Sequence, residues 1–296
     1  MNLEGVGVAL VTPFLSNGNI DHEALRGVVR HVIDHGADYL VALGTTAETA
    51  TLEPEEKQAV LNTIIEENNK QLPLVLGLGG NNTVALVKSL EQLNPEPFAA
   101  ILSVTPYYNK PSQEGLYCHY KKLSENSPLP LIVYNVPGRT GVNLLPQTFI
   151  RIANECSNVV AIKEASGDLE QGKELIHRVG GRWQVLSGDD ALNLKLYQLG
   201  SAGCISVLGN ALPNQIAKMF AFMDEGNARA AEALDEELKR LIELLFTEGN
   251  PTGIKGLLSL LNICDKTVRL PLVEASQTLL QQFDKQLNRP AVSENN

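Results

Sequence analysis

Short apolar runs alternate along the chain with longer segments in which apolar and polar residues repeat at helical spacing. Apolar runs of this kind, flanked by turn residues, are typical of strands buried on both faces of a parallel sheet. Eight such runs predict strands at residues 7–12, 39–43, 74–78, 98–104, 131–134, 159–163, 183–186 and 203–207. A helical pattern follows each of them, which is the order of elements in repeated βα units.

Several of the helical segments carry signals at their ends. Asp21 and Ser112 precede helical patterns, where a side-chain oxygen can accept a hydrogen bond from a free backbone amide. Pro54 opens another helix, since its fixed φ suits the first helical position. Gly36 provides a stop for the first helix, because glycine readily adopts the left-handed conformation found at helix ends.

The number of βα repeats indicates the architecture. Eight repeats within residues 1–224 fit a closed (β/α)8 TIM barrel better than an open doubly wound sheet. Later in the chain the pattern contains helices only, at residues 228–246, 254–263 and 274–287. We therefore expect a catalytic barrel at 1–224 and a three-helix C-terminal extension at 225–296, packed together as one compact unit. Residues 289–296 are expected to be frayed.

Composition and charge narrow the classes of function. Of the 296 residues 44% are hydrophobic and 20% charged, which is ordinary globular usage. The net charge of −10, without a basic stripe, argues against a nucleic-acid partner. No basic segment precedes the first apolar run, as a signal peptide would require, and no apolar run reaches transmembrane length. Four widely spaced cysteines predict free thiols and, with the other features, a cytoplasmic protein without membrane contact.

Two motifs resemble a metal site and a cofactor-binding loop, and both are incomplete. His31 and His35 are one helical turn apart, but no third ligand is evident, so we expect two solvated histidines near a helix end. The GLGGNN run at residues 77–82 lacks the last glycine of a dinucleotide-binding loop and predicts a tight βα turn. We expect neither a metal site nor a bound cofactor.

Reactive side chains gather where the predicted strands end. In a TIM barrel the carboxyl ends of the strands form one face, and this face holds the active site. The residues at these positions are Gly44, Thr45, Thr46, Thr105, Pro106, Tyr107, Tyr108, Tyr134, Asn135, Arg139, Lys163, Ser187, Gly188, Asp189 and Ser206. A lysine amine can form an imine with a ketone, while hydroxyl groups can bind a carboxylate and relay protons. The combination predicts a site for a keto acid.

Taken singly, each of these residues has a structural alternative. Lys163, at the end of a strand buried on both faces, is partly desolvated, which favours its neutral, nucleophilic form; it could instead cap the strand and pair with Glu164. Tyr108 could be an aromatic residue of an interface or of the core. Arg139 could bind a carboxylate bidentately or lie on the surface of a glycine-containing turn.

Five motifs in order resemble one family over nearly the whole chain. They are GTTAETATL (44–52), VTPYYNKPSQEGLY (104–117), YNVPGRTG (134–141), IKEASGD (162–168) and LSGDDA (186–191). The pattern is similar to the pyruvate-dependent class I aldolases and lyases of the N-acetylneuraminate lyase and dihydrodipicolinate synthase superfamily. The arginine of YNVPGRTG resembles the dihydrodipicolinate synthase branch, which acts in the diaminopimelate route to lysine.

The resemblance implies a lyase that condenses pyruvate with L-aspartate 4-semialdehyde. It implies that Lys163 forms the Schiff base, that Arg139 binds the carboxylate of the semialdehyde, and that Tyr108 enters the active site of a neighbouring subunit. A homo-oligomer, typically a tetramer built as a dimer of dimers, is implied by the same matching. The remaining implied roles are proton transfer by Tyr134, Thr45 and Tyr108, and pyruvate binding by Thr46, Ile205 and Gly188.

The chain departs from the family pattern at several positions. Ala47 and Thr49 replace the usual glycine and serine of the threonine motif, which leaves the two threonine hydroxyls in place. Lys57 and Ala85 stand where forms inhibited by lysine carry a histidine and a glutamate, so we predict weak or absent feedback by lysine. Two other functions remain open: an aldolase of the same fold acting on a 4-hydroxy-2-keto acid, and a non-catalytic keto-acid-binding protein.

Overall fold

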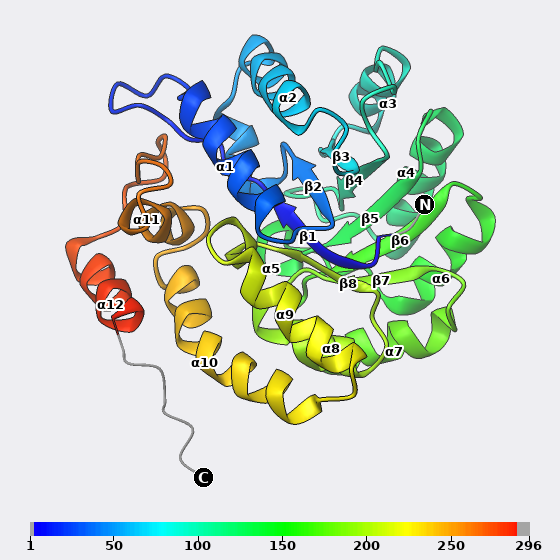
Figure 1. Ribbon diagram of the computed structural model, residues 1–296. Helices are drawn as coiled ribbons and strands as arrows, with labels where there is room; N and C mark the ends of the chain where they lie inside the picture. The colour runs from blue at the N-terminus through cyan, green and yellow to red at the C-terminus, as the bar shows by residue number, and fades with distance from the viewer. Residues whose placement is uncertain (1–2, 289–296) are drawn as a thin grey trace.

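Eight parallel strands close into a barrel in the computed structural model, which describes residues 3–288 (Figure 1). The strands are β1 (Gly5–Ala9), β2 (Tyr39–Ala42), β3 (Leu74–Gly77), β4 (Ala100–Val104), β5 (Leu131–Asn135), β6 (Val159–Glu164), β7 (Gln184–Ser187) and β8 (Gly203–Ser206). Each strand pairs with the next along the chain, and β1 also pairs with β8, which leaves no free edge. The prediction of a (β/α)8 TIM barrel is confirmed.

Helices surround the barrel and continue after it. They are α1 (His22–Asp34), α2 (Pro54–Asn68), α3 (Thr83–Glu91), α4 (Gln113–Asn126), α5 (Pro137–Thr140), α6 (Pro146–Glu155), α7 (Leu169–Val179), α8 (Asn193–Gln198), α9 (Pro213–Asp224), α10 (Ala228–Thr247), α11 (Thr252–Leu260) and α12 (Gln277–Leu287). The last three are the helices predicted for the extension. Among residues 3–288, no helix combines the length and apolar character needed to cross a membrane. The predicted fraying of residues 289–296 falls outside the described residues.

The predicted helix-end signals act as expected. A side-chain oxygen of Asp21 accepts a hydrogen bond from the amide of Ala24, at 2.9 Å, and so caps α1. Ser112 caps α4 in the same way, and Pro54 is the first residue of α2. After α1 ends, Gly36 has φ of +94°, a conformation that side chains with a Cβ rarely adopt.

Several element boundaries and the surroundings of one histidine differ from the sequence predictions. The first strand starts at Gly5 and ends at Ala9, earlier than the predicted 7–12, because β1 ends where its pairing with β2 ends and the apolar residues beyond it pack outside the barrel. His31 is not freely solvated: it is half-buried and its Nε2 lies 3.0 Å from the carbonyl oxygen of Ala211. Burial lowers the pKa of His31.

A β-bulge lies between β5 and β6 and sets which residues of β6 face the barrel interior. Leu131 pairs with Val159, but the next residue of β5, Ile132, pairs with Ala161, so β6 has one extra residue at this point. Beyond the bulge, Tyr134 is opposite Lys163. The extra residue therefore aligns these two side chains on the same face of the sheet.

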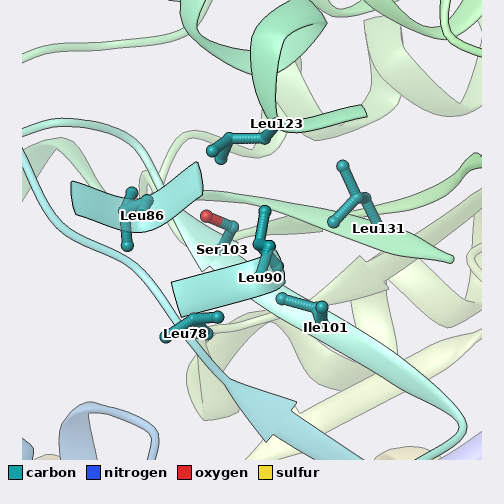
Figure 2. Close-up of a pocket in the computed structure, with 7 residues that line it drawn as sticks. All are labelled: Leu78, Leu86, Leu90, Ile101, Ser103, Leu123 and Leu131. Carbon is teal, nitrogen blue, oxygen red and sulfur yellow. The ribbon is translucent and has the colours of Figure 1, made fainter. Parts of the chain in front are cut away.

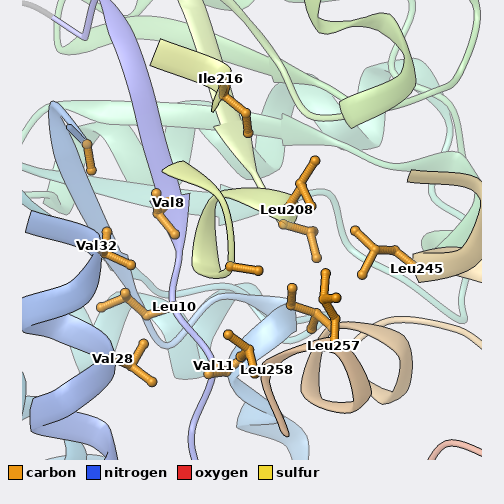
Figure 3. Close-up of a cluster of buried hydrophobic side chains, with 14 of the residues drawn as sticks. Val8, Leu10, Val11, Val28, Val32, Leu208, Ile216, Leu245, Leu257 and Leu258 are labelled. Carbon is orange, nitrogen blue, oxygen red and sulfur yellow. The ribbon is translucent and has the colours of Figure 1, made fainter. Parts of the chain in front are cut away.

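The C-terminal helices share a hydrophobic core with the barrel. Figure 3 shows Val8 of β1, Val28 of α1, Leu208 after β8, and Leu245 and Leu257 of the extension in one buried cluster. Figure 1 shows α10, α11 and α12 along one side of the barrel, next to α1 and α9. The extension therefore packs on the barrel through apolar contacts.

A small apolar pocket lies between the barrel and helices α3 and α4 (Figure 2). Leucine and isoleucine side chains line it, together with Ser103, and it has no room for a water molecule. The Ser103 hydroxyl is buried here without a hydrogen-bond partner. The pocket lacks the convergent polar groups of a ligand site, and we regard it as a packing defect of the outer core.

Candidate active site

Lys163 lies inside the barrel near the carboxyl end of β6. The residue is 5% exposed, and its Nζ forms no hydrogen bond or ion pair with the part of the chain that the structure describes. The alternative of an ion pair with Glu164 is wrong, because neighbouring residues of a strand point to opposite faces of the sheet. Glu164 faces the helices, where its carboxylate accepts hydrogen bonds from Asn135 and Gln171.

The ring of Tyr134 contacts the amine of the lysine. The Nζ atom of Lys163 lies 4.4 Å from the centroid of the Tyr134 ring, over its face. Both side chains are buried in the barrel interior, on adjacent strands and in the register that the bulge produces. An aromatic face attracts a cation without removing its proton, and it also gives a neutral amine an apolar contact. The phenol and the amine thus belong to one site.

Gly188 leaves the space that the lysine side chain occupies. A Cβ atom at this position would lie 2.7 Å from Cε of Lys163 and 2.7 Å from Cβ of Ala165. Real side chains do not approach so closely, so a glycine is required by packing rather than by its backbone angles. Ile205 of β8 is 1% exposed and belongs to the same interior cluster as Tyr134, where it supplies an apolar wall.

The two threonines after β2 occupy a short 3₁₀ turn, Thr45–Ala47. Thr45 is exposed, whereas Thr46 is buried and its hydroxyl accepts a hydrogen bond from Nδ2 of Asn250 at 3.1 Å. The carbonyl oxygen of Asn250 in turn accepts a hydrogen bond from the guanidinium of Arg139, also at 3.1 Å. Asn250 therefore connects Thr46 with Arg139.

Asn250 was missed by the sequence analysis. It lies just before α11, in the extension, and neither hydrophobic periodicity nor a strand-end position marks it. Its side chain is 8% exposed, and its Oδ1 atom has no partner. The one available signal was its place before a proline at a helix start, which is common at ordinary turns. Only the tertiary structure shows that it reaches the threonine turn.

Asp190 was also missed, and it organises the end of β8. One of its oxygens accepts a hydrogen bond from the hydroxyl of Ser206 at 2.6 Å, and the other accepts from the amides of Val207 and Leu208. Asp190 is 3% exposed, so these bonds replace the water that its carboxylate would otherwise bind. The carboxylate fixes the chain that follows Ile205.

Tyr108 is separate from the other predicted site residues. Its side chain is 86% exposed, and its φ of +74° is unusual for a residue other than glycine. Tyr107 beside it is also exposed, and its carbonyl oxygen accepts a hydrogen bond from Asn81. The loop after β4 thus presents two aromatic side chains away from its own barrel.

A closed TIM barrel with an unpaired lysine buried at its catalytic face places the protein in the class of imine-forming barrel lyases. The model of the dihydrodipicolinate synthetase family matches residues 2–289. The chain belongs to this family.

Known relatives agree with this assignment over nearly the full length of the chain. The 4-hydroxy-tetrahydrodipicolinate synthase of Flavobacterium psychrophilum is 46% identical over 288 residues, which are 96% of this chain and 98% of the relative. A dihydrodipicolinate synthase structure from Thermotoga maritima has a TM-score of 0.93 at 38% identity and covers 97% of this chain and 98% of its own. The chloride-inhibited synthase of Acinetobacter baumannii, solved in complex with pyruvate, has a TM-score of 0.92 at 40% identity, with 97% and 98% covered.

Proposed function

We propose that this protein is a 4-hydroxy-tetrahydrodipicolinate synthase, which condenses pyruvate with L-aspartate 4-semialdehyde in lysine biosynthesis. The observation that carries the proposal is the unpaired amine of the buried residue Lys163 against the ring of Tyr134. Full-length similarity to synthases at 41–46% identity supports the choice of reaction.

The chemistry assigned to Lys163 is imine formation. Its neutral amine attacks the keto carbon of pyruvate, and loss of water leaves a protonated imine. Removal of a proton from the pyruvate methyl group then gives an enamine, whose carbon attacks the aldehyde of the second substrate. The aldehyde oxygen takes up a proton, and cyclisation through the substrate's own amine releases Lys163. No metal or cofactor is needed to balance these steps.

The proposed proton carriers are Tyr134, Thr45 and Tyr108. A hydroxyl can donate one proton while accepting another, so three hydroxyls in sequence can move a proton between the reacting carbon and solvent. The contact between the ring of Tyr134 and Lys163 supports a role for Tyr134 in the first transfer. The exposure of Thr45 suits the solvent end of such a chain.

Substrate carboxylates are assigned to two groups of residues. Thr46 would bind the carboxylate of pyruvate, while Ile205 and Gly188 shape the pocket around its carbon atoms. Arg139 would bind the carboxylate of the semialdehyde, since its guanidinium can form paired hydrogen bonds with two oxygens. The link from Arg139 to Thr46 through Asn250 supports a common site for both substrates.

Trapping of the imine tests the proposal. Incubation with pyruvate and borohydride should add one reduced pyruvyl group, and peptide mapping by mass spectrometry should place it on Lys163. A Lys163→Met variant, which keeps the length of the side chain but has no amine, is the matched control. Turnover of pyruvate with L-aspartate 4-semialdehyde then tests the second substrate. An adduct without turnover would favour the other pyruvate-dependent aldolases, and absence of both would exclude the enzyme class.

The exposed Tyr108 supports a homo-oligomer, which we propose to be a tetramer in the cytoplasm. An aromatic side chain that is 86% exposed in one chain is well placed to be covered by a second copy. In such an assembly Tyr108 would complete the proton relay of the neighbouring subunit. The four free cysteines are compatible with a reducing compartment.

A further inference from the structure

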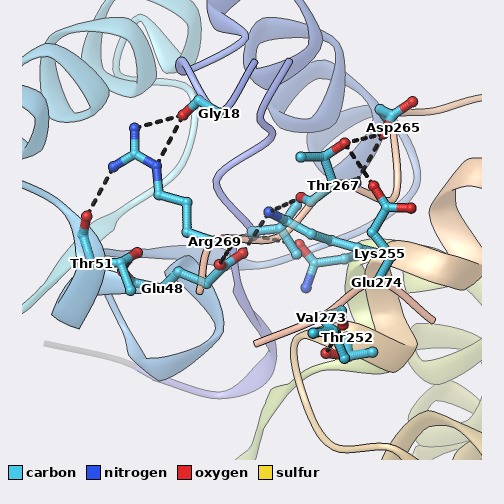
Figure 4. A network of polar contacts seen from close by, with 12 residues as sticks. Gly18, Glu48, Thr51, Thr252, Lys255, Asp265, Thr267, Arg269, Val273 and Glu274 are labelled. Atoms are coloured by element: carbon cyan, nitrogen blue, oxygen red, sulfur yellow. Dashed lines mark hydrogen bonds and ion pairs between the residues drawn. The ribbon is translucent and has the colours of Figure 1, made fainter. Parts of the chain in front are cut away.

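A completely buried ion pair joins the extension to the loop that carries the threonine turn (Figure 4). Nζ of Lys255, in α11, lies 2.5 Å from Oε1 of Glu48, and their side chains are 0% and 1% exposed. Lys255 also donates to the carbonyl oxygen of Thr267 at 2.8 Å. The other carboxylate oxygen of Glu48 accepts a hydrogen bond from the amide of Arg269 at 2.9 Å. Both oxygens of the carboxylate are thus held by the C-terminal segment.

Glu48 directly follows the turn that contains Thr45 and Thr46. Its amide donates to the carbonyl oxygen of Thr45 at 3.2 Å and closes the 3₁₀ turn. Its φ and ψ of 55° and 35° are left-handed, a conformation that is unfavourable for a glutamate. Such a conformation persists only where surrounding contacts enforce it. The contacts that Lys255 and Arg269 make with Glu48 can hold its backbone in this conformation.

Stability alone is a poor explanation for this ion pair. Removing two charges from water costs as much as or more than their attraction returns, and apolar side chains of similar size often fit such places equally well. An ion pair, however, fixes distance and direction more sharply than an apolar contact does. The Glu48–Lys255 ion pair is therefore suited to fixing the position of the segment that contains Glu48.

We propose that Glu48 and Lys255 are positioning residues for the proton relay, and that they act by fixing the turn on which Thr45 lies. This inference rests on the proposed function and adds a role for the C-terminal extension in the reaction. Asn250, just before the same extension helix, donates a hydrogen bond to the hydroxyl of Thr46. The extension thus contacts Thr46, the second residue of the turn, and Glu48, which follows its last residue. These two contacts restrict the movement of the turn.

A double-mutant cycle between Glu48 and Thr45 tests the proposal. Glu48→Gln keeps the shape and one acceptor oxygen but removes the charge that binds Lys255. We expect kcat of the condensation to fall on the order of 10- to 100-fold, as small displacements of catalytic groups do. In a Thr45→Val background, which has no hydroxyl to position, the same substitution should change kcat less than about 2-fold.

Glu56→Gln is the matched control. Glu56 forms a neighbouring ion pair with the side chain of Arg269, at 2.6 Å, and so links the same C-terminal segment to α2 rather than to the turn. The chemical change is identical, and kcat should remain within about 2-fold of wild type. A loss of kcat in this variant equal to that in Glu48→Gln would mean that any loosening of the extension is enough, and would overturn the proposal.

A second variant guards against misfolding. Glu48→Gln combined with Lys255→Met removes both charges together, so no unpaired charge is buried. We expect a thermal midpoint close to wild type, the same fraction of Lys163 trapped by pyruvate and borohydride at long times, and a reduced kcat. A normal kcat, or equal effects of Glu48→Gln with and without Thr45, would refute the positioning role. A wild-type enzyme without synthase turnover would instead refute the proposed function.

Discussion

At the scale of single residues, Lys163 lies beside an aromatic ring and beside a glycine that has no side chain. No carboxylate of residues 3–288 contacts its amine. Tyr134 covers the amine, and Gly188 leaves room for the methylene groups below it. Neither neighbour is an acidic side chain, and the amine forms no ion pair within the part of the chain that the structure describes. A free amine can rotate toward a substrate carbonyl, which a paired lysine could not do without first breaking its bond.

Gly188→Ala is expected to disable the enzyme by displacing Lys163. The new Cβ would meet Cε of the lysine at 2.7 Å, and either the side chain or the strand end must move. We expect kcat to fall on the order of 100-fold, since a displacement of about 1 Å can have this effect. Gly27→Ala is the control, because a Cβ in that helix meets nothing within 4 Å. Steady-state kinetics of the two variants test this prediction, and equal kcat values for the two variants would contradict it.

Arg139→Ala should separate the two substrates. The variant loses the guanidinium proposed to bind the semialdehyde carboxylate but leaves Lys163 and Tyr134 unchanged. We expect kcat/KM for the semialdehyde to fall on the order of 100-fold, as expected for loss of a charged hydrogen-bonding group. The rate at which pyruvate and borohydride modify Lys163 should stay within about 2-fold. Unchanged kinetics with the semialdehyde would count against the synthase and in favour of another aldolase.

At the scale of elements, β6 shows where sequence reasoning succeeds and where it stops. Its apolar run predicted a buried strand at 159–163; the strand is confirmed, and it runs one residue further, to Glu164. Strict alternation, however, would place Val159 and Lys163 on the same face, because they are four residues apart. In the structure Val159 packs with the outer helices and Lys163 faces inward, since the bulge adds one residue between them. No pattern in the sequence marks the bulge.

Contacts between distant segments limit prediction of the site in the same way. Thr46 and Arg139 were predicted from strand-end positions and from the family pattern, but Asn250 joins them across more than a hundred residues of chain. Helix caps such as Asp21 were predictable because they involve neighbours within one turn. Local signals can be recognised in the sequence, whereas long-range contacts depend on how the barrel closes.

Helices α2 and α3 carry the two positions from which we predict weak or absent feedback by lysine. Lys57 lies on α2 and Ala85 on α3, so an incoming lysine would meet a positive charge and find no carboxylate from position 85. We expect turnover at millimolar lysine to remain within about 2-fold of the uninhibited rate. The double variant Lys57→His with Ala85→Glu is the comparison, and gain of inhibition there would support the assignment. Tight inhibition of the natural enzyme would refute it.

At the scale of the whole molecule, the candidate site and the hydrophobic core are both built from parts that are far apart in the chain. The barrel supplies the lysine and the hydroxyls, while α11 and the segment before it hold the threonine turn. The division at residue 224 therefore stays a prediction about sequence pattern. A shared apolar core joins the two parts (Figure 3).

Mixed oligomers can show whether Tyr108 acts in a neighbouring subunit. We expect Tyr108→Phe and Lys163→Met chains to be weakly active or inactive alone. In a mixed dimer, one site would have both an intact lysine and an intact tyrosine from the partner, so co-expression should restore a substantial fraction of wild-type activity. Activity of mixed species is measured after separation by two different affinity tags. No gain over the parent variants would place Tyr108 outside the partner's site.

Acid should destabilise the protein through His119. This histidine is 4% exposed, and burial lowers its pKa from 6.5 to about 4. Between these values the unfolded chain binds a proton that the folded chain does not, so the free energy of unfolding falls as pH drops from about 6.5 to about 4. The decrease in the free energy of unfolding that His119 causes reaches about 3 kcal/mol near pH 4.

Thermal midpoints measured between pH 7 and pH 4.5 check this prediction. His119→Gln should flatten the decline, since glutamine cannot take up a proton in either state. His177→Gln, on the exposed face of α7, is the matched control and should leave the decline as it is. The same slope in the wild type and both variants would show that other groups govern the response to acid.

The contacts that Asn250 and Lys255 make with the threonine turn and with Glu48 also affect when the site can form during synthesis of the chain. A ribosome releases β8 before α11, so a nascent chain can close its barrel while the turn still has neither of these partners. Lys163 and Tyr134 would already be in place in such a chain. Activity should therefore appear late in synthesis, and products cut short before residue 250 should lack efficient activity, because they have neither these contacts nor the extension's share of the apolar core.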